Sequence, residues 1–380
     1  MKRLLTIGHS YVVALNRRLP DEIARQASGR WDVTVAAPAH YHGDLRSITL
    51  EAVPGDVADL RAIPAHLTRF PHVMFYGGLR RLLAEPWDLV HCWEEPYVAA
   101  CAEIAALARP GVPLVFATFQ NLAKRYPPPF SWFERRVLQR AGGWIAFGRT
   151  VHDTQLARRG YPDIPSRLIP PGVDTRNFRP DAGQRARIRS DRGWKDDVPV
   201  VGYLGRFVPE KGLSVLTAAL RKVSGPWRAL FVGGGPDQSM LRALSVSYPG
   251  RVSIATDITH DQVPHYLNAM DVLCAPSQTT PGWREQFGRM LIEAMACGVP
   301  VVASRSGEIP HVIADAGILL PEDDVAAWSA TLGRVLADPD ERRDLADRGL
   351  RRARTEFAWS VVARRHVEFF DGLVAGSWPR

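Results

Sequence analysis

Short apolar runs alternate with helical patterns along almost the whole chain. The runs are rich in β-branched and aromatic residues and end at Gly, Pro or Ser, which is typical of buried strands. Between them, apolar residues recur at helical spacing. We expect strands within residues 3–8, 31–38, 87–93, 112–119, 143–148 and 166–171, and again within 198–205, 227–235, 251–256, 270–277 and 298–304. Alternating strand and helix predict βαβ units and therefore parallel sheets.

The alternation stops once and then restarts. A polar segment punctuated by Pro and Gly, residues 170–197, separates the two series, and a chain of 380 residues has room for two domains. We therefore predict an α/β protein with two doubly wound domains, 1–175 and 176–357. From about residue 325 the pattern is helical, and residues 351–373 predict a last amphipathic helix that needs a surface to pack on.

Composition favours an intracellular protein without structural metals. The four cysteines form no CxxC pair, so neither a zinc nor a redox signature is present. Cys92, Cys274 and Cys297 lie in apolar stretches, as buried thiols of a reducing cytoplasm do. The N-terminus is typical of a first strand rather than of a signal peptide. No stretch approaches the roughly 18 apolar residues of a transmembrane helix, so we expect a cytoplasmic protein.

The net charge of +8 leaves two interpretations open. It indicates either a polyanionic partner or a solvated basic surface. No helix-turn-helix, zinc-finger or aromatic RNA-binding pattern is visible, so we do not expect nucleic acid. Two segments, 72–85 and 124–140, combine aromatics with arginines. They suit either a peripheral contact with anionic lipid at the inner membrane face or a core that aromatics fill while arginines stay solvated.

The first candidate loop, "GYLGRFVPEKG", follows a predicted strand that ends at Gly205. Ligands of open parallel sheets bind at the carboxyl ends of strands. Arg206 and Lys211 stand there beside the start of the next helix, and two such cations can neutralise a diphosphate without a metal. The alternative is a pair of surface cations in a polar loop.

The second candidate loop, "VGGGPDQSML", places three glycines after a strand, where backbone can approach a ligand. Gly234 is the middle one. A dinucleotide-binding fingerprint would need glycine at the position of Gln238, so the loop does not predict an NAD site. No phosphate-binding GxxxxGK[ST] loop occurs either.

The third loop leads into a helix that we expect over 287–296 and that Gly298 ends. Glu285 and Glu293 lie eight positions apart, which a helix spans in about 12 Å. This roughly matches the distance from a sugar across a diphosphate to a ribose. We expect the glutamates at opposite ends of one ligand, with the helix N-terminus facing its phosphates. Alternatively, Glu293 forms a buried salt bridge with an arginine.

Residues 165–322 resemble retaining GT-B glycosyltransferases of family 4. The stretch "REQFGRMLIEAMACGVPVVAS" is similar to their E-x7-E signature, and "GYLGRFVPEKGL" is similar to their Arg/Lys diphosphate loop. The segments "RLIPPGVDTRNFRP", "VGGGPDQSML" and "VPHYLNAMDVLCAPS" also resemble recurring family segments, in the right order. The first 160 residues match mainly in the alternation of strand and helix.

The resemblance implies the GT-B architecture: two Rossmann-like domains that face a cleft. The N-terminal domain would bind the acceptor, the C-terminal domain would bind the donor, and a last helix over about 358–380 would cross back to the N-terminal domain. The implied reaction moves a hexose-type sugar from a nucleotide diphosphate, UDP- or GDP-linked, to an acceptor hydroxyl with retention of configuration. The acceptor would be a small molecule, a glycan or a lipid-linked compound, and neither metal nor cofactor would be needed.

The resemblance also implies roles for single residues. Arg206 and Lys211 would bind the diphosphate, Glu293 the ribose hydroxyls and Glu285 the transferred sugar, so that Arg206, Lys211 and Glu285 would carry catalysis. The other implied donor-side residues are Gly205, Gly234, Phe287, Gly288, Arg289 and Gly307. The only D-x-D, Asp338–Pro339–Asp340, is typical of a turn at a helix boundary.

The acceptor side departs from the family pattern. Many members carry a Gly-Gly loop after the first strand, where this chain has Gly8, His9 and Ser10, and many carry a histidine where this chain has Gln120. His9 is either an acceptor-side residue or a structural one. The acceptor-side candidates are His9, Glu94, Glu95, Gln120, Asn121 and Lys124, followed by Arg125 and Tyr126.

Glu94 and Glu95 have two readings: they orient an acceptor hydroxyl, or they begin a helix, where acidic residues are common. Two alternatives for the whole chain also stay open. One is another enzyme on a similar fold, such as a nucleotide-sugar epimerase or a phosphorylase. The other is a non-catalytic protein that binds nucleotides or polyanions.

Overall fold

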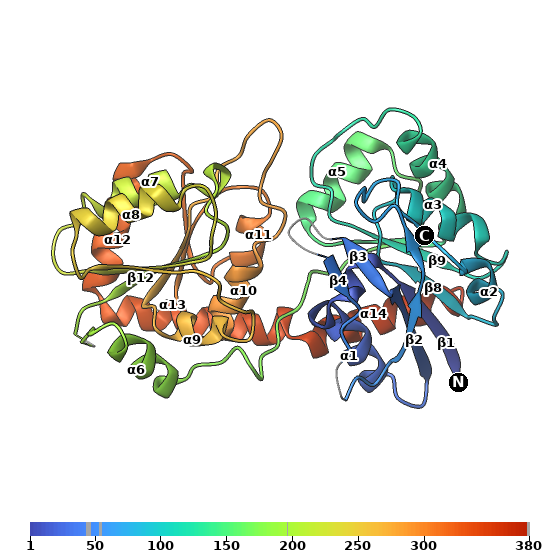
Figure 1. Ribbon diagram of the computed structural model, residues 1–380, viewed down its shortest axis with the longest axis horizontal. Helices are drawn as coiled ribbons and strands as arrows, with labels where there is room; N and C mark the ends of the chain where they lie inside the picture. Colours follow the sequence, from blue (N-terminus) through green and yellow to red (C-terminus); the bar gives the residue numbers. More distant parts are fainter. Residues whose placement is uncertain (43–46, 53–54, 196, 378–380) are drawn as a thin grey trace. The chain divides into compact units, whose positions relative to one another are not determined.

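The computed structural model describes residues 1–42, 47–52, 55–195 and 197–377. The chain forms two compact units (Figure 1). Unit 1 comprises Met1–Pro171 together with Trp359–Arg380, and unit 2 comprises Gly172–Ala358. The sequence analysis placed these boundaries after residues 175 and 357, and the two units divide after residues 171 and 358.

Unit 1 is built on a seven-stranded parallel sheet in the order β11-β10-β9-β8-β1-β2-β5. All the strands predicted for this half are present. The edge strand β5 was missed, because its residues alternate between charged and apolar and most are only partly buried. The strands are β1 Lys2–Ile7, β2 Trp31–Pro38, β5 Asp59–Ile63, β8 Leu89–Cys92, β9 Leu114–Thr118, β10 Gly143–Ala146 and β11 Ser166–Leu168.

Helices cover both faces of this sheet (Figure 1). Successive strand residues face opposite sides, so Leu4 and Leu5 enter different cores. The helices are α1 Arg18–Gln26, α2 Leu79–Leu83, α3 Ala99–Leu107, α4 Phe130–Arg140, α5 Arg149–Arg159 and α14 Trp359–Val374. Short 3-10 turns (His9–Val12 and Ala14–Arg17) and two small antiparallel pairs (β3 His40–His42 with β4 Ser47–Thr49, and β6 Ala65–His66 with β7 Phe75–Tyr76) complete the described unit.

Unit 2 repeats this plan with a six-stranded parallel sheet in the order β14-β13-β12-β15-β16-β17. Every predicted strand of this half is present, and only the short edge strand β17 was missed. The strands are β12 Val200–Leu204, β13 Arg228–Val232, β14 Val252–Ala255, β15 Val272–Ala275, β16 Val301–Ser304 and β17 Ile318–Leu320. The helices are α6 Ala182–Ser190, α7 Leu213–Leu220, α8 Gln238–Ser247, α9 Val263–Asn268, α10 Arg289–Ala296, α11 Ile309–Ile313, α12 Val325–Ala337 and α13 Pro339–Arg352.

The polar segment 170–197, which separates the two predicted series of strands, is not all loop. It contains α6, which packs on α9 within unit 2. Arg189 of α6 is buried and bonds the carboxylate of Asp271 at 2.5 Å and the carbonyl of Ala269 at 3.0 Å. The arginines that make this segment look polar therefore include one that is paired inside the unit.

The prediction of one continuous helix over 351–373 is wrong. Helix α13 ends at Arg352, a π-helical turn follows over Ala353–Phe357, and Ala358 is extended. The chain passes from unit 2 to unit 1 at this point. The predicted turn at Asp338 is confirmed, because its carboxylate caps α13 by accepting from Asp340 N at 2.9 Å.

Helix α14 returns to unit 1, which confirms the expected crossing of the last helix. Its apolar face packs with α1 over one side of the sheet. Asp371 near its end accepts hydrogen bonds from Lys2 at 2.9 Å and from the indole of Trp31 at 3.0 Å. The N-terminal strand and the C-terminal helix therefore stabilise each other.

The buried histidine of α14 makes the stability of unit 1 sensitive to acid. Burial lowers the pKa of His366 to about 4, against a smaller opposite effect of its hydrogen bond to Val362 O. As the pH falls below about 6.5, the unfolded chain takes up this proton before the folded one. We expect full stability above pH 7 and a loss of up to about 3 kcal/mol between pH 6.5 and 4.

Urea unfolding followed between pH 8 and pH 4 measures this loss. The variant His366→Leu should show a shallower pH dependence than the wild type over this range. Equal slopes for the two proteins would contradict the assignment to His366.

Candidate active site

The loops that follow β12, β13 and β15 interlock at the carboxyl edge of the sheet in unit 2. Phe207 N in the first loop donates to Gly234 O in the second at 2.8 Å. Gln278 N in the loop after β15 donates to Glu210 O at 2.8 Å. The structure thus brings together the three loops that the sequence singled out, at the edge where parallel sheets bind ligands.

Gly307 makes the close approach of a fourth loop possible. Its φ is +53°, and a Cβ there would lie 2.0 Å from the carbonyl oxygen of Glu285. The next residue, Glu308, donates its backbone N–H to the same carbonyl at 3.0 Å. The loop after β16 therefore fixes the backbone of Glu285, and no larger residue fits at position 307.

Lys211 and Glu285 form a close ion pair. Lys211 Nζ lies 2.5 Å from Glu285 Oε2, and Ser277 Oγ donates to the same oxygen at 3.0 Å. Both charged side chains are largely buried, at 14% and 8% exposure. The ammonium also lies 4.9 Å from the ring centroid of Trp283. A residue expected on the diphosphate and a residue expected on the sugar are therefore in contact.

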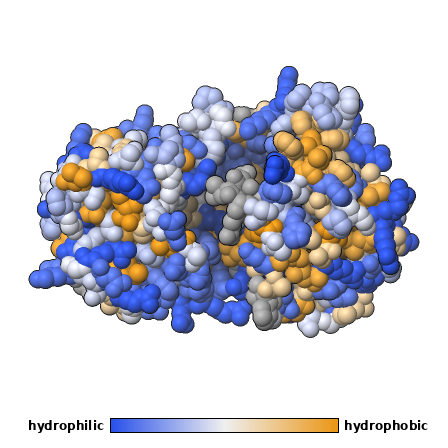
Figure 2. All heavy atoms as spheres, viewed as in Figure 1, coloured by the Kyte–Doolittle hydropathy of each residue, from blue (hydrophilic) through white to orange (hydrophobic). Residues whose placement is uncertain are grey.

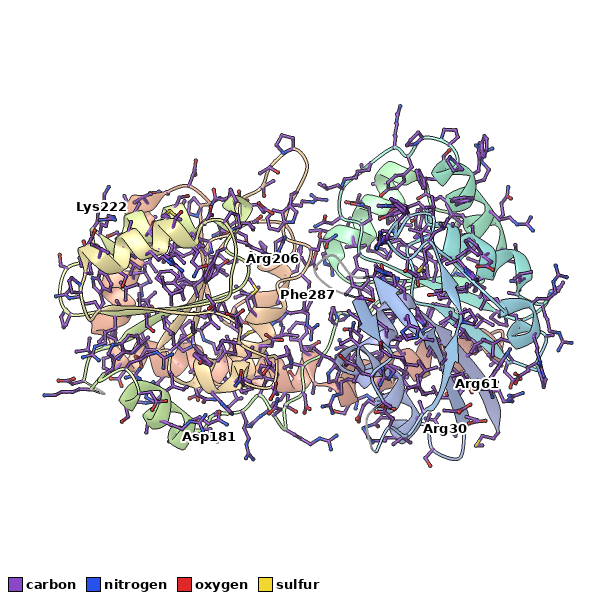
Figure 3. All side chains as sticks on the ribbon, in the orientation of Figure 1. Arg30, Arg61, Asp181, Arg206, Lys222 and Phe287 are labelled. Carbon is purple, nitrogen blue, oxygen red and sulfur yellow. The ribbon has the colours of Figure 1, made fainter. Side chains whose placement is uncertain are left out.

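Arg206, labelled in Figure 3, follows β12 at the same edge and is exposed to solvent. Its side chain is 66% exposed, and its ion pair with Glu210 spans 3.7 Å. An exposed pair of this kind contributes little to stability, so Arg206 can leave it for an anionic ligand. Gly205 precedes it with a φ of +150°, and Gly234 has open space where a Cβ would stand.

Glu293 is buried and has His260 as its nearest ionic partner. His260 Nε2 lies 3.0 Å from Glu293 Oε1, and Arg289 Nε lies 3.9 Å from the same oxygen. The salt bridge between Glu293 and an arginine, which the sequence analysis left open, is present with Arg289. It is the longer of these two ionic contacts of Glu293. The shorter contact involves a histidine that the sequence analysis did not select.

Helix α10 begins at Arg289, two residues later than predicted. Gly288 precedes it in a left-handed conformation, with φ of +80°. Glu285 therefore lies in the preceding loop and only Glu293 lies on the helix, so the helical rise does not set the distance between them. The predicted end is confirmed, since α10 ends at Ala296 and Gly298 follows with φ of +69°.

Phe287, a donor-side candidate, belongs to the hydrophobic core of unit 2. Its side chain is buried and packs edge-on against Phe357, with ring centroids 5.9 Å apart.

In unit 1, His9 and Glu94 meet at the carboxyl ends of β1 and β8. Glu94 accepts from His9 Nδ1 at 2.6 Å, from His9 N at 2.7 Å and from the hydroxyl of Tyr76 at 2.5 Å. Burial alone would lower the pKa of His9, but the charge of Glu94 and its hydrogen bond outweigh burial and raise it. The imidazole therefore keeps its proton to a higher pH than usual.

Glu94 and Glu95 do not begin a helix, because α3 starts only at Ala99. Glu95 accepts from the hydroxyl of Thr118 at 2.8 Å and from Phe119 N at 2.7 Å. It thus holds the end of β9, next to the candidates Gln120 and Asn121.

The segment after β9 is partly buried and partly open. Gln120 donates to the hydroxyl of Tyr126 at 2.8 Å, and the ring of Tyr126 stacks on Tyr97 with centroids 4.0 Å apart. Asn121 is buried, and its carbonyl accepts from Thr154 at 3.2 Å. Lys124 is exposed.

Four residues of these sites were missed by sequence reasoning: Ser277, Trp283, His260 and Tyr76. Ser277 and His260 follow β15 and β14, so the rule that ligand sites lie at strand ends would have found them. Trp283 immediately precedes the quoted signature, two positions before Glu285. Tyr76 has no such signal, since its contact with Glu94 depends on folding.

Two family models match the chain. One, described as "Glycosyl transferases group 1", covers residues 184–352, and the other, described as "Glycosyltransferase Family 4", covers residues 18–177.

The four cysteines are all buried. Among the described helices, none has the length and hydrophobicity that a membrane span requires.

Relatives with named activities match most of the chain. A D-inositol 3-phosphate glycosyltransferase of Saccharomonospora viridis is 36% identical over 343 residues, which cover 79% of this chain and 74% of that protein. The enzyme of the same name from Salinispora tropica is 30% identical, over 88% of this chain and 71% of its own. A GDP-mannose-dependent alpha-(1-6)-phosphatidylinositol monomannoside mannosyltransferase of Mycobacterium tuberculosis is 29% identical, over 82% and 85%.

Solved structures share the fold. A sucrose-phosphate synthase from Thermosynechococcus elongatus superimposes with a TM-score of 0.74 at 24% identity, over 99% of this chain and 100% of the other. Anabaena Alr3699/HepE in complex with UDP and glucose gives 0.74 at 18% identity, over 98% and 100%. With both family models and these relatives in agreement, the chain belongs to the group 1 glycosyl transferases of glycosyltransferase family 4, and it is a glycosyltransferase of the GT-B fold.

Proposed function

We propose that the protein transfers a hexose-type sugar from a UDP- or GDP-linked donor to an acceptor hydroxyl with retention of configuration. The observation that carries this proposal is the contact of Lys211 with Glu285 at 2.5 Å. It joins the cation that we propose to bind the diphosphate to the carboxylate that we propose to bind the sugar, at the carboxyl edge of the sheet in unit 2. Family membership sets aside the epimerase and non-catalytic alternatives.

The charges of this site suit departure of a diphosphate. As the bond from the anomeric carbon to the phosphate oxygen breaks, the sugar becomes oxocarbenium-like and the leaving group gains negative charge. An ammonium has three N–H donors, so Lys211 can hold Glu285 and a phosphate oxygen together. Arg206 and the N-terminus of α10 add positive potential.

The acceptor hydroxyl then forms the new bond on the face that the leaving group has left. We propose that its proton passes to an oxygen of the departing diphosphate, which lies on that face. This step needs no protein base and explains retention in one displacement.

The acceptor that we propose is a phosphorylated polyol. The support comes from the names of the relatives, which act on D-inositol 3-phosphate and on a phosphatidylinositol monomannoside. On this chain the acceptor-side candidates His9, Glu94, Gln120, Asn121 and Lys124 would supply the contacts.

Release of nucleoside diphosphate tests the function directly. UDP- and GDP-hexoses are incubated with and without inositol phosphates and other polyols, and the product's anomeric proton is read by NMR. We expect release only with an acceptor, and an unchanged anomeric configuration. Equal release without acceptor, or an inverted product, would overturn the proposal.

We also expect transfer to be independent of divalent metal ions. Arg206 and Lys211 supply at the diphosphate the two positive charges that a metal would otherwise supply. Activity measured in EDTA should equal that in magnesium or manganese. Loss of turnover in EDTA and its recovery with added metal would contradict this role of the two cations.

Unit 1 also offers a surface for anionic lipid. Phe70, Phe75 and Trp132 are 62%, 40% and 61% exposed. Phe130, two residues before Trp132, lies 5.8 Å from the ring of His72, so the two aromatic segments adjoin. Figure 2 shows apolar atoms gathered on the visible face of this unit. Exposed cations lie within or just before these segments: Arg69, Lys124, Arg125, Arg135 and Arg136.

We propose that these aromatics and cations hold unit 1 on an anionic bilayer. The protein should co-sediment with phosphatidylglycerol vesicles at low salt and much less with phosphatidylcholine vesicles. The double variant Phe70→Ala/Trp132→Ala should lose most of this binding. Absence of wild-type binding at low salt would remove the membrane contact.

A further inference from the structure

The carboxylate of Glu293 is held from one side. The two ionic contacts that the described residues make with it, from His260 at 3.0 Å and from Arg289 at 3.9 Å, both engage Oε1. Its other oxygen, Oε2, is the one that remains for a ligand. A buried carboxylate with one oxygen fixed presents the second in a defined direction.

His260 is itself held in place. It lies in the loop between β14 and α9, where Val263 N donates to its carbonyl at 3.3 Å. The ring of Phe178 packs against the imidazole, with centroids 5.3 Å apart. The neighbouring Thr259 N donates to the side chain of Gln262 at 3.1 Å, which closes the turn.

The contact between His260 and Glu293 also determines which ring nitrogen of His260 carries a proton. An ionised carboxylate only accepts hydrogen bonds, so Nε2 of His260 must carry the proton that points at Glu293. The histidine donates in this direction whether its ring is neutral or charged. Arg289 is a weaker substitute, because its guanidinium is 43% exposed and more distant.

We infer that His260 is a positioning residue for the donor: it fixes Glu293 so that Oε2 meets the ribose hydroxyls of the nucleotide. The inference rests on the proposed function, in which Glu293 binds the ribose. Without His260, the carboxylate turns towards Arg289, and the ribose hydroxyls lose a pre-aligned acceptor.

The test compares nucleotides that differ only at the ribose. Calorimetry measures the dissociation constants of UDP and GDP and of their 2′-deoxy and 3′-deoxy forms. For the wild type we expect at least one deoxy form to bind about tenfold more weakly, as loss of a hydrogen bond to a charged group predicts. In His260→Ala the ratio of the dissociation constant of the deoxy form to that of the parent nucleotide should fall below about threefold. His260→Gln keeps an N–H donor and should restore most of the wild-type ratio.

His265→Ala is the matched control. His265 lies five positions along the chain on α9, and its ring nitrogen lies 3.3 Å from Arg187 instead. This variant should keep the wild-type ratio. Thermal unfolding checks that every variant is folded.

Glu293→Ala separates the two claims. If Glu293→Ala leaves the ratio of the deoxy and parent dissociation constants unchanged, Glu293 does not bind the ribose. The proposed function then fails at this residue. If Glu293→Ala abolishes the ratio while His260→Ala keeps the wild-type value, the ribose role stands and the inference about His260 is overturned.

Discussion

Lys211→Ala should lower the rate of sugar transfer by at least ~100-fold, the order of effect of removing one charge-stabilising group from an active site. Lys211 is largely buried, and its ammonium contacts Glu285 at 2.5 Å. In the proposed reaction it faces the diphosphate as that group gains charge. Arg206 is too exposed to replace a buried cation.

Initial rates of nucleoside diphosphate release measure this effect. Lys222→Ala is the control, because Lys222 is an exposed lysine two residues after the end of α7, well away from Arg206 in unit 2 (Figure 3). It should retain the wild-type rate. A folded Lys211→Ala protein with near-normal activity would place the phosphates elsewhere.

Glu293→Ala should weaken nucleotide binding, whereas Glu285→Ala should impair sugar transfer. Glu293 is expected to accept hydrogen bonds from ribose hydroxyls, which the free nucleotide and the sugar donor share. Its loss should weaken binding of both by about 1.5–3 kcal/mol, the range for a hydrogen bond to a charged group. Glu285 is expected to touch only the transferred sugar.

The ion pair with Lys211 sharpens the expectation for Glu285. Removing its carboxylate takes a negative charge away from the cation that faces the phosphates. Glu285→Ala should therefore bind the bare nucleoside diphosphate at least as well as the wild type does, yet lose transfer or sugar selectivity. Calorimetric titration of both variants with UDP and GDP measures the difference.

The opposite pattern would reverse the two assignments. That pattern is loss of nucleotide affinity in Glu285→Ala and its retention in Glu293→Ala. If neither variant changes binding or transfer, the two carboxylates are structural.

Much of the fold could be predicted from the sequence, because buried strands carry a local signal. Runs such as Val200–Leu204 are apolar throughout and bounded by turn residues, so their place was predicted from pattern alone. Two strands at sheet edges, Asp59–Ile63 and Ile318–Leu320, are mostly only partly buried and lack this pattern. The helical pattern over 351–373 did not show the break at Ala358, because the apolar spacing continues across it while the two sides pack in different units. The family resemblance, which implied a last helix over about 358–380, placed this break correctly.

The candidate site was likewise predicted only in part from the sequence. The sequence by itself determined the candidates Arg206, Lys211, Glu285 and Glu293. Strand ends and the spacing of a signature are local properties of the chain, so they can be recognised without the fold. Only the tertiary structure decided which of these residues meet. Lys211 and Glu285 are 74 positions apart, and His260 and Glu293 are 33 apart. Such contacts depend on the order of strands in the sheet, which places β12 beside β15 and no local pattern encodes.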